Sequence, residues 1–100
     1  MGLIGLCAKA GKLTYGTDAC IELIQKKKAK LIIVAQNAAE RTKKNMKFIC
    51  DNNKVNICFY GEIEDLSHSI GKQNKAVIGI REVNFANQIL KIINGGEIIG

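Results

Sequence analysis

The stretch Leu31-Ile32-Ile33-Val34-Ala35 is an uninterrupted apolar run that is rich in β-branched residues. Such a run is typical of a strand covered on both faces, whereas a strand with one wet face alternates apolar and polar residues. Basic residues lead into the run, and the polar pair Gln36-Asn37 follows it as a turn. We therefore predict a central strand with helices on both sides of it.

Upstream of this strand, the sequence predicts two helices and a short strand. Residues 3–10 place apolar side chains on one helix face, and Gly11 ends that helix. Residues 13–15 are extended, and Gly16-Thr17-Asp18 then offers caps for a second helix. The second helix ends in Lys26-Lys27-Lys28, where cations suit the negative end of the helix dipole.

Downstream, helices and strands continue to alternate. The patterns predict a helix over 40–52, a strand over 55–60, a short helix over 63–70, a strand over 76–80 and a last helix capped by Asn84. This order predicts a three-layer α/β/α sandwich around a mixed, mostly parallel four-stranded sheet. The short first strand is the candidate for running against the others. We expect residues 1–100 to form one domain, with a loose tail at about 94–100.

Charge is distributed unevenly along the 100 residues. The chain holds 15 Lys and Arg against 9 Asp and Glu, for a net charge of +6. Ten of the basic and three of the acidic residues lie in the first half, so the positive charge belongs to that half. This asymmetry favours a polyanionic partner, with nucleic acid first and an anionic membrane second. No apolar run approaches the length of a membrane span, and the N-terminus lacks a signal-peptide pattern, so we expect no membrane partner.

Enzyme chemistry has little support in the sequence. The one histidine, His68, lies between serines and is expected at the surface. The acidic residues Glu62, Glu64 and Asp65 resemble a carboxylate cluster, but they also suit the start of a helix. There is no phosphate-binding glycine motif and no set of metal ligands, so we expect no cofactor, no metal and no small-molecule substrate.

The cysteines have no metal-binding spacing. Each lies among apolar residues, and none forms a CxxC pair; they are Cys7, Cys20, Cys50 and Cys58. We predict that they are reduced side chains of the core and not catalytic.

Several polar and basic segments fall at predicted turns. These are Gly11-Lys12, Gly16-Thr17-Asp18, Gln36-Asn37 and the segment 71–75. Loops of an α/β sandwich can cluster at one end of the sheet, where a helix N-terminus offers N–H groups to phosphate. Amide side chains there can read base edges, and lysines can hold the backbone. The alternative is that these are only turn-forming residues.

Read together, these segments resemble the kink-turn-binding ribosomal proteins of the archaeal L7Ae and eukaryotic L30e type. The resemblance rests on Gly11-Lys12-Leu13, Gly16-Thr17-Asp18 and the stretch from Lys28 to Asn37. Thr42-Lys43-Lys44 and Ser69-Ile70-Gly71-Lys72 resemble the small bacterial members. The likeness implies an α/β/α sandwich and a non-enzymatic, ribosomal-protein-like role in the cytoplasm.

The family's RNA signature is only partly present. Where that family has Gly-X-Asn-Glu and then a Lys one turn later, this chain has Gly16-Thr17-Asp18-Ala19 and then Glu22. Asp18 cannot donate as an amide does, Ala19 has no acceptor, and Glu22 would repel phosphate. The second contact loop, Ile70 to Ala76, keeps the apolar and basic character that the family presents to a flipped-out base.

We therefore predict a protein that docks structured RNA, with kink-turns, ribosomal RNA and the ribosome as candidates, and that acts as a monomer. The alternative is a protein-interaction module on the same fold that has lost kink-turn recognition. The residues expected to contact RNA lie in these loops and at nearby helix ends: Lys12, Gly16, Thr17, Asp18, Lys28, Lys30, Gln36, Asn37, Lys43, Lys44, Ile70, Gly71, Lys72, Asn74 and Lys75.

Overall fold

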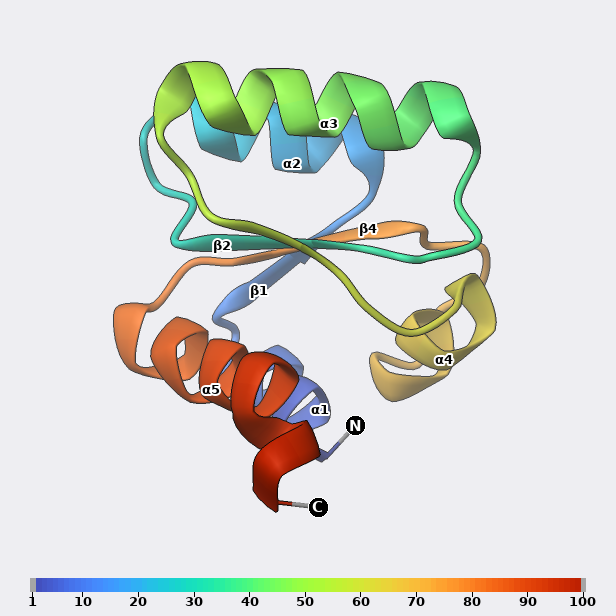
Figure 1. Ribbon diagram of the computed structural model, residues 1–100, viewed down its shortest axis with the longest axis vertical. Coiled ribbons are helices and arrows are strands. Elements are labelled where there is room, and N and C mark those ends of the chain that lie inside the picture. Colours follow the sequence, from blue (N-terminus) through green and yellow to red (C-terminus); the bar gives the residue numbers. More distant parts are fainter. Residues whose placement is uncertain (1, 100) are drawn as a thin grey trace.

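The computed structural model describes residues 2–99, with side chains for residues 2–94 (Figure 1). Helices and strands alternate along the chain as the sequence patterns predict. The elements are α1 (Gly2–Lys9), β1 (Leu13–Tyr15), α2 (Thr17–Gln25), β2 (Leu31–Val34), α3 (Glu40–Asn53), β3 (Ile57–Phe59), α4 (Ile63–Ser69), β4 (Val77–Ile80) and α5 (Val83–Ile99).

The four strands form one sheet between two layers of helices. The strand order is β1-β4-β2-β3. Helices α2 and α3 cover one face of this sheet, and α1, α4 and α5 lie on the other (Figure 1). This arrangement confirms the predicted three-layer α/β/α sandwich with a mixed sheet.

The direction of the strands differs from the expected one. Strands β2 and β3 are parallel, whereas β4 is antiparallel to both β1 and β2. Three strands therefore point the same way, but the exception is β4 and not the short first strand. Because β4 lies between β1 and β2, two of the three neighbouring strand pairs are antiparallel and only β2 with β3 is parallel. The expectation of a mostly parallel sheet is therefore wrong for the pairing of neighbouring strands.

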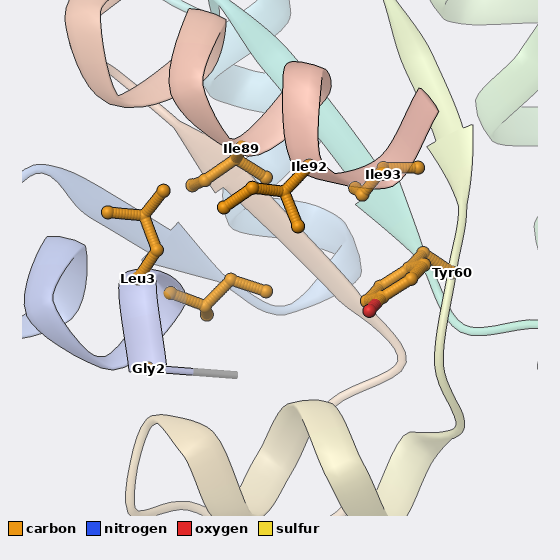
Figure 2. A pocket seen from close by; sticks show the side chains of 7 residues that line it. Gly2, Leu3, Tyr60, Ile89, Ile92 and Ile93 are labelled. Atoms are coloured by element: carbon orange, nitrogen blue, oxygen red, sulfur yellow. The ribbon is translucent and has the colours of Figure 1, made fainter. Parts of the chain in front are cut away.

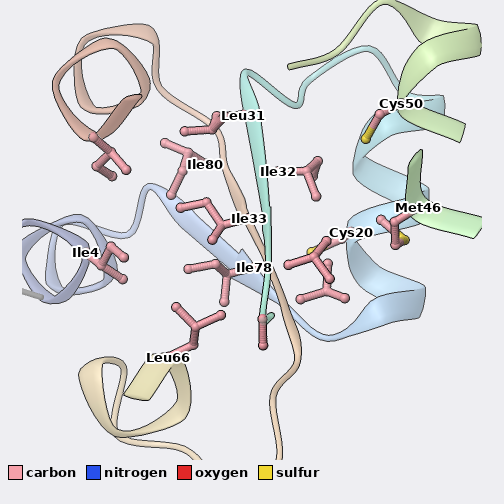
Figure 3. Close-up of a cluster of buried hydrophobic side chains, with 14 of the residues drawn as sticks. Ile4, Cys20, Leu31, Ile32, Ile33, Met46, Cys50, Leu66, Ile78 and Ile80 are labelled. Carbon is pink, nitrogen blue, oxygen red and sulfur yellow. The ribbon is translucent and has the colours of Figure 1, made fainter. Parts of the chain in front are cut away.

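Side chains of the central strands fill the core on both faces of the sheet. Every residue of β2 and β4 is buried. Leu31 and Ile33 point toward the layer that holds Ile4 and Leu66, whereas Ile32 points toward α2 and α3 (Figure 3). This alternation is the period of two of a strand, and it explains why the run carries no polar residue.

Glycine lets α2 approach the sheet closely. A Cβ at Gly79 of β4 would lie 3.2 Å from Leu23 and 3.3 Å from the sulfur of Cys20. Both neighbours belong to α2, so the missing side chain at Gly79 leaves room for this helix directly over β4.

The last helix differs from the prediction at both ends. Its N-terminus lies at Val83, and Glu82 accepts a hydrogen bond from the Phe85 N–H at 2.8 Å, so Glu82 takes the place expected for Asn84. The expected loose tail is helical as far as Ile99, since two glycines weaken a helix without ending it as proline would. Gly100 lies outside the described residues.

Candidate functional site

The direction of each strand determines which loops meet. Strands β1, β2 and β3 all end at the edge where β4 begins, with Tyr15 opposite Ile78 and Val34 opposite Val77. We call this edge the loop end, formed by residues 15–18, 36–37 and 70–76. It lies at the right of Figure 1, beside the start of α2 and α4. Most of the residues expected to contact RNA lie there.

The N-terminus of α2 is open at the loop end. Gly16 precedes the helix with φ 93° and ψ 146°, a conformation that residues with a side chain rarely adopt. Its N–H donates to the Val77 carbonyl at 2.9 Å, which joins the helix start to β4. Among the described residues no side chain caps this helix, so the predicted capping by Thr17 or Asp18 is wrong. The first N–H groups of α2 therefore face outward, with the exposed carboxylate of Asp18 among them.

The 70–76 loop is held in shape by a buried serine. The Oγ of Ser67 accepts a hydrogen bond from the Lys75 N–H at 2.8 Å, and Ser67 is only 4% exposed. The Lys72 N–H donates to the Ser67 carbonyl at 2.8 Å. Gly71 and Asn74 both adopt positive φ angles, of 70° and 56°. Glycine and asparagine are the residues that tolerate this conformation best, so the loop has the residues that its turns need.

Tyr15 joins the start of α2 to the 70–76 loop at the loop end. Tyr15 is the last residue of β1 and is 38% exposed. The Nζ atom of Lys72 lies 5.2 Å from the ring centroid, and that of Lys75 lies 5.4 Å from it. Both distances fall within cation–π range. Sequence reasoning missed this residue, although an aromatic residue directly before the helix-starting Gly16 was a visible signal.

The polar side chains in and near the connection after β2 form hydrogen bonds within the protein. Asn37 Oδ1 accepts a hydrogen bond from the Ile63 N–H at 2.8 Å, which supports the start of α4. Gln36 Nε2 donates to the Phe59 carbonyl at 3.4 Å. Lys43 Nζ donates to the Gln36 carbonyl at 2.8 Å and forms an ion pair with Glu40 Oε2 at 3.1 Å. These residues lie at the predicted end of the sheet, and structural bonds already occupy some of their polar atoms.

The other predicted residues of the loop end and of α3 differ in exposure. Lys44 is exposed on α3, Gly71 and Asn74 are exposed in the loop, and Ile70 is half-buried against the core.

Glu22 repels a phosphate less than its position in the sequence indicates. It forms an ion pair with Lys26 at 2.9 Å, one helical turn away. The hydrogen bond from Lys26 lowers the pKa of the Glu22 carboxyl, so the group stays ionised but partly neutralised by its partner.

Three predicted residues do not belong to the loop end. Lys12 precedes β1, and Lys28 and Lys30 precede β2, so all three lie at the opposite edge of the sheet. Two hydrogen bonds define that edge: the Lys30 N–H donates to the Ile80 carbonyl, and the Arg81 N–H donates to the Lys12 carbonyl. The expectation of one site that includes these lysines is corrected, because the connections before and after a strand lie at opposite edges.

The acidic cluster around α4 is a helix cap. Glu62 and Asp65 form a reciprocal capping box, in which the Glu62 N–H donates to Asp65 Oδ2 at 3.2 Å. His68 is exposed, as expected. Among the residues that the structure describes, no three His, Cys, Asp or Glu side chains gather to hold a metal ion. Within the same residues, no helix is long and apolar enough to cross a membrane.

The cysteine thiols are unsuited to nucleophilic chemistry. All four are free; Cys7, Cys20 and Cys50 are buried, and Cys58 is half-buried. Burial raises the pKa of Cys20 to about 12 and those of Cys7 and Cys50 to about 11. At neutral pH these thiols are protonated, and a thiol is a much weaker nucleophile than a thiolate.

A small hollow between α1 and α5 has a different character. Its volume is about 150 Å³, and it is lined by Gly2, Leu3, Ile4, Tyr60, Ile89, Ile92 and Ile93 (Figure 2). Its lining is mainly apolar and carries no charged side chain, which distinguishes it from the loop end.

Comparison with known proteins agrees with this geometry. Residues 1–91 match the model of the ribosomal protein L7Ae/L30e/S12e/Gadd45 family. The chain belongs to this family. The resemblance read from the sequence is thereby confirmed, and the L7Ae/L30e/S12e/Gadd45 match spans every element from α1 to β4 and the first turns of α5.

Two curated relatives match the chain over nearly its whole length. One is the RNA-binding protein YlxQ of Enterococcus faecium, which is 40% identical and covers 95% of this chain and 91% of the relative. The other is the RNA-binding protein YlxQ of Bacillus subtilis, which is 30% identical and covers 92% of each chain.

Solved structures share the fold of this L7Ae/L30e/S12e/Gadd45 family member. A Bacillus halodurans protein of unknown function superposes with a TM-score of 0.90 at 27% identity, covering 93% of this chain and 94% of the other. A 15.5 kDa RNA-binding protein of Giardia lamblia superposes with a TM-score of 0.78, covering 94% of this chain and 83% of the other. The Giardia protein is only 18% identical, so this second likeness concerns the fold alone.

Proposed function

We propose that this chain is a monomeric, non-enzymatic RNA-binding domain of the cytoplasm that docks structured RNA through the loop end. Its relatives are named RNA-binding proteins, and its basic residues outnumber its acidic ones by 15 to 9. Ribosomal RNA and kink-turns are the candidate targets, in line with the ribosomal-protein family.

The observation that carries the proposal is the convergence of three RNA-binding groups at one edge of the sheet. The open N-terminus of α2 offers backbone N–H groups to a phosphate. Tyr15 offers an exposed ring on which a base can stack. The Nζ atoms of Lys72 and Lys75 lie over that ring, so a stacking base takes the place of at least one of them, and both can then neutralise the adjacent backbone.

Two residues at the start of α2 differ from those that read a kink-turn in the resembling proteins. In those proteins, an Asn amide and a Glu carboxylate read the sheared G·A pairs. In this chain, Asp18 takes the place of the Asn and Ala19 that of the Glu. A lost bidentate base contact is worth roughly 1–3 kcal/mol, or about one to two powers of ten in affinity. We therefore expect weak kink-turn binding that depends mainly on Tyr15 and the 70–76 loop.

Electrophoretic mobility shift titrations test both parts of the proposal. The RNAs are a kink-turn hairpin, the same hairpin with its G·A pairs replaced, and a plain duplex. We expect salt-dependent binding, and each of Lys72→Ala and Lys75→Ala should lower the slope of log affinity against log salt by about 0.7–0.9. Absence of binding to all three RNAs at low salt would contradict the proposal.

A triple variant isolates base recognition from charge. Asp18→Asn, Ala19→Glu and Glu22→Lys together should strengthen binding to the kink-turn hairpin about tenfold or more over the G·A-replaced hairpin. Asp51→Lys adds the same net charge at the far end of α3, away from the loop end, and should strengthen binding to both hairpins equally. Equal gains in the two variants would mean that the G·A pairs are read elsewhere.

A protein-interaction role is the second candidate, and one surface favours it. Phe48 on α3 and Phe59 on the edge strand β3 are 65% and 36% exposed. They line one hollow with Lys43, Lys44 and Lys47, and two of these lysines are neutralised by ion pairs with Glu40 and Asp51. Exposed aromatic side chains in a nearly neutral surrounding suit a protein partner better than a polyanion. If none of the three RNAs bound, the protein-interaction role would replace the RNA-binding role.

A further inference from the structure

Basic residues gather at the sheet edge opposite the loop end. We call this the basic edge: Lys12, Lys27, Lys28, Lys30, Lys54 and Arg81. The strand register brings most of them together, because Leu13 and Leu31 both lie opposite Ile80, the residue before Arg81. Lys27 and Lys54 follow the C-terminal ends of α2 and α3, which reach the same edge (Figure 1).

Few carboxylates neutralise this edge. Within the described residues, Lys27, Lys28 and Lys30 form no ion pair. The side chain of Arg81 donates to the Gly11 carbonyl, which carries no charge. Glu82 lies nearby, and backbone hydrogen bonds from Phe85 and Asn84, with the charge of Lys12, lower the pKa of its carboxyl, so it offsets part of the charge of Lys12. The basic edge therefore carries an excess of positive charge over several neighbouring loops.

Helix dipoles do not account for all of these lysines. A cation is favourable at a helix C-terminus, which explains Lys27 and Lys54 in part. Both residues nevertheless adopt left-handed φ angles, of 60° and 58°, where glycine or asparagine would be less strained. The dipole also explains Lys28 in part, because its N–H donates to the Leu23 carbonyl at the end of α2. Lys30 lies farther along the connection to β2, where the dipole gives no reason for a cation.

The basic edge and the loop end are separate sites. From Lys30 to Ala35 the chain advances five residues along β2, which spans roughly 17 Å at about 3.3 Å per residue. This separation exceeds the Debye length of about 10 Å at 0.1 M salt. The two surfaces also face away from each other, so an RNA helix at one leaves the other free.

We propose that the basic edge is a second RNA-binding surface, which holds the phosphate backbone of an RNA duplex while the loop end holds structured RNA. The protein then bridges two RNA segments, an inference that rests on the proposed function. An RNA backbone fits better than an anionic membrane, because among the described residues Val83 is the one large, exposed apolar side chain within two positions of a residue of the basic edge. Lipid surfaces are usually bound with several such side chains as well as charge.

Native mass spectrometry with two RNAs of different mass tests the bridge. The probes are a kink-turn hairpin and a plain duplex, mixed with the intact protein at an ionic strength of about 0.1 M, where the Debye length is about 10 Å. We expect a complex of one protein, one hairpin and one duplex. Lys28→Glu with Lys30→Glu should remove this ternary complex and keep the protein–hairpin complex. Lys72→Glu with Lys75→Glu should weaken hairpin binding and keep the duplex.

A variant of equal charge serves as the control. Lys47→Glu with Lys91→Glu changes the net charge as much, at exposed positions of α3 and α5, and should keep the ternary complex. Duplex binding should also become less salt-dependent by about one unit of slope for each lysine removed at the basic edge.

Three results would overturn the inference. The wild type could form only binary complexes, or the ternary complex could survive Lys28→Glu with Lys30→Glu. Alternatively, vesicles of phosphatidylserine could bind the wild type but not this double variant while no ternary complex forms. Failure to bind either RNA would instead overturn the proposed function itself.

Discussion

Replacement of Gly16 by alanine probes the backbone that opens the N-terminus of α2. With φ 93° and ψ 146°, Gly16 occupies a region that is essentially restricted to glycine. A Cβ built at this position would meet no heavy atom within 4 Å, so no clash with a neighbour contributes. The penalty is then the backbone strain alone, about 1–3 kcal/mol. We expect Gly16→Ala to lower the free energy of unfolding by this amount.

Urea unfolding followed by circular dichroism measures the loss. A small domain has a slope of about 1–3 kcal/mol per molar urea, so the midpoint should fall by roughly 1 M while the slope stays unchanged. Where the variant remains folded, its RNA affinity should fall too, because the first turn of α2 must shift to relieve the strain.

Two other glycines provide controls for this reasoning. Gly2 also has open space at its Cβ position but no positive φ, so Gly2→Ala should be neutral or slightly stabilising. Gly71 has φ 70° and open space, and Gly71→Asn should stay within about 0.5 kcal/mol because asparagine tolerates this conformation. A loss below about 0.5 kcal/mol for Gly16→Ala, or an equal loss for Gly2→Ala, would refute the argument.

Burial raises the pKa of Cys20 from 9.0 to about 12, so above pH 9 the unfolded chain releases a proton that the folded protein keeps, and stability falls with rising pH. Cys20→Ala should reduce the loss of unfolding free energy with rising pH by up to about 1.4 kcal/mol per pH unit. Urea unfolding at pH 8.5 and 10 measures this loss, and an equal loss in the variant and the wild type would contradict the prediction. Ser67→Ala should cost about 1–3 kcal/mol and speed hydrogen exchange at the Lys75 amide, because that N–H loses its buried acceptor; unchanged exchange would mean that the 70–76 loop is held otherwise. Tyr15→Leu should weaken RNA binding by about 1–3 kcal/mol while Tyr15→Phe keeps it, since stacking needs the ring and not the hydroxyl; equal losses would exclude stacking.

Much of the fold could be predicted because the decisive signals are local. The run Leu31–Ala35 indicates a strand buried on both faces, and the structure buries every one of these residues. The direction of β4 could not be predicted in this way. Val77–Ile80 is equally apolar in either direction, so its pattern shows a central strand but not which way the strand runs.

The site was predicted less completely, for a topological reason. Lys30 and Gln36 are close in the sequence, yet one precedes β2 and the other follows it, so they lie at opposite edges of the sheet. Because they are close in the sequence, Lys28 and Lys30 were predicted to share one site with Gln36 and Asn37, although β2 separates the two pairs. Tyr15 was missed because its neighbours Lys72 and Lys75 come from a distant part of the chain.

The insertion of β4 between β1 and β2 has a consequence for biosynthesis. In the described part of the chain, the one neighbour of strand β1 in the sheet is β4, and Leu13–Tyr15 pair with Ile78–Ile80. A nascent chain can therefore pair β2 with β3 early, whereas β1 must wait until the segment up to Ile80 has been translated. Throughout that interval the N-terminal strand and the inner edge of β2 both remain open to other chains. During synthesis, completion of the sheet therefore follows translation of β4, a segment of only four residues.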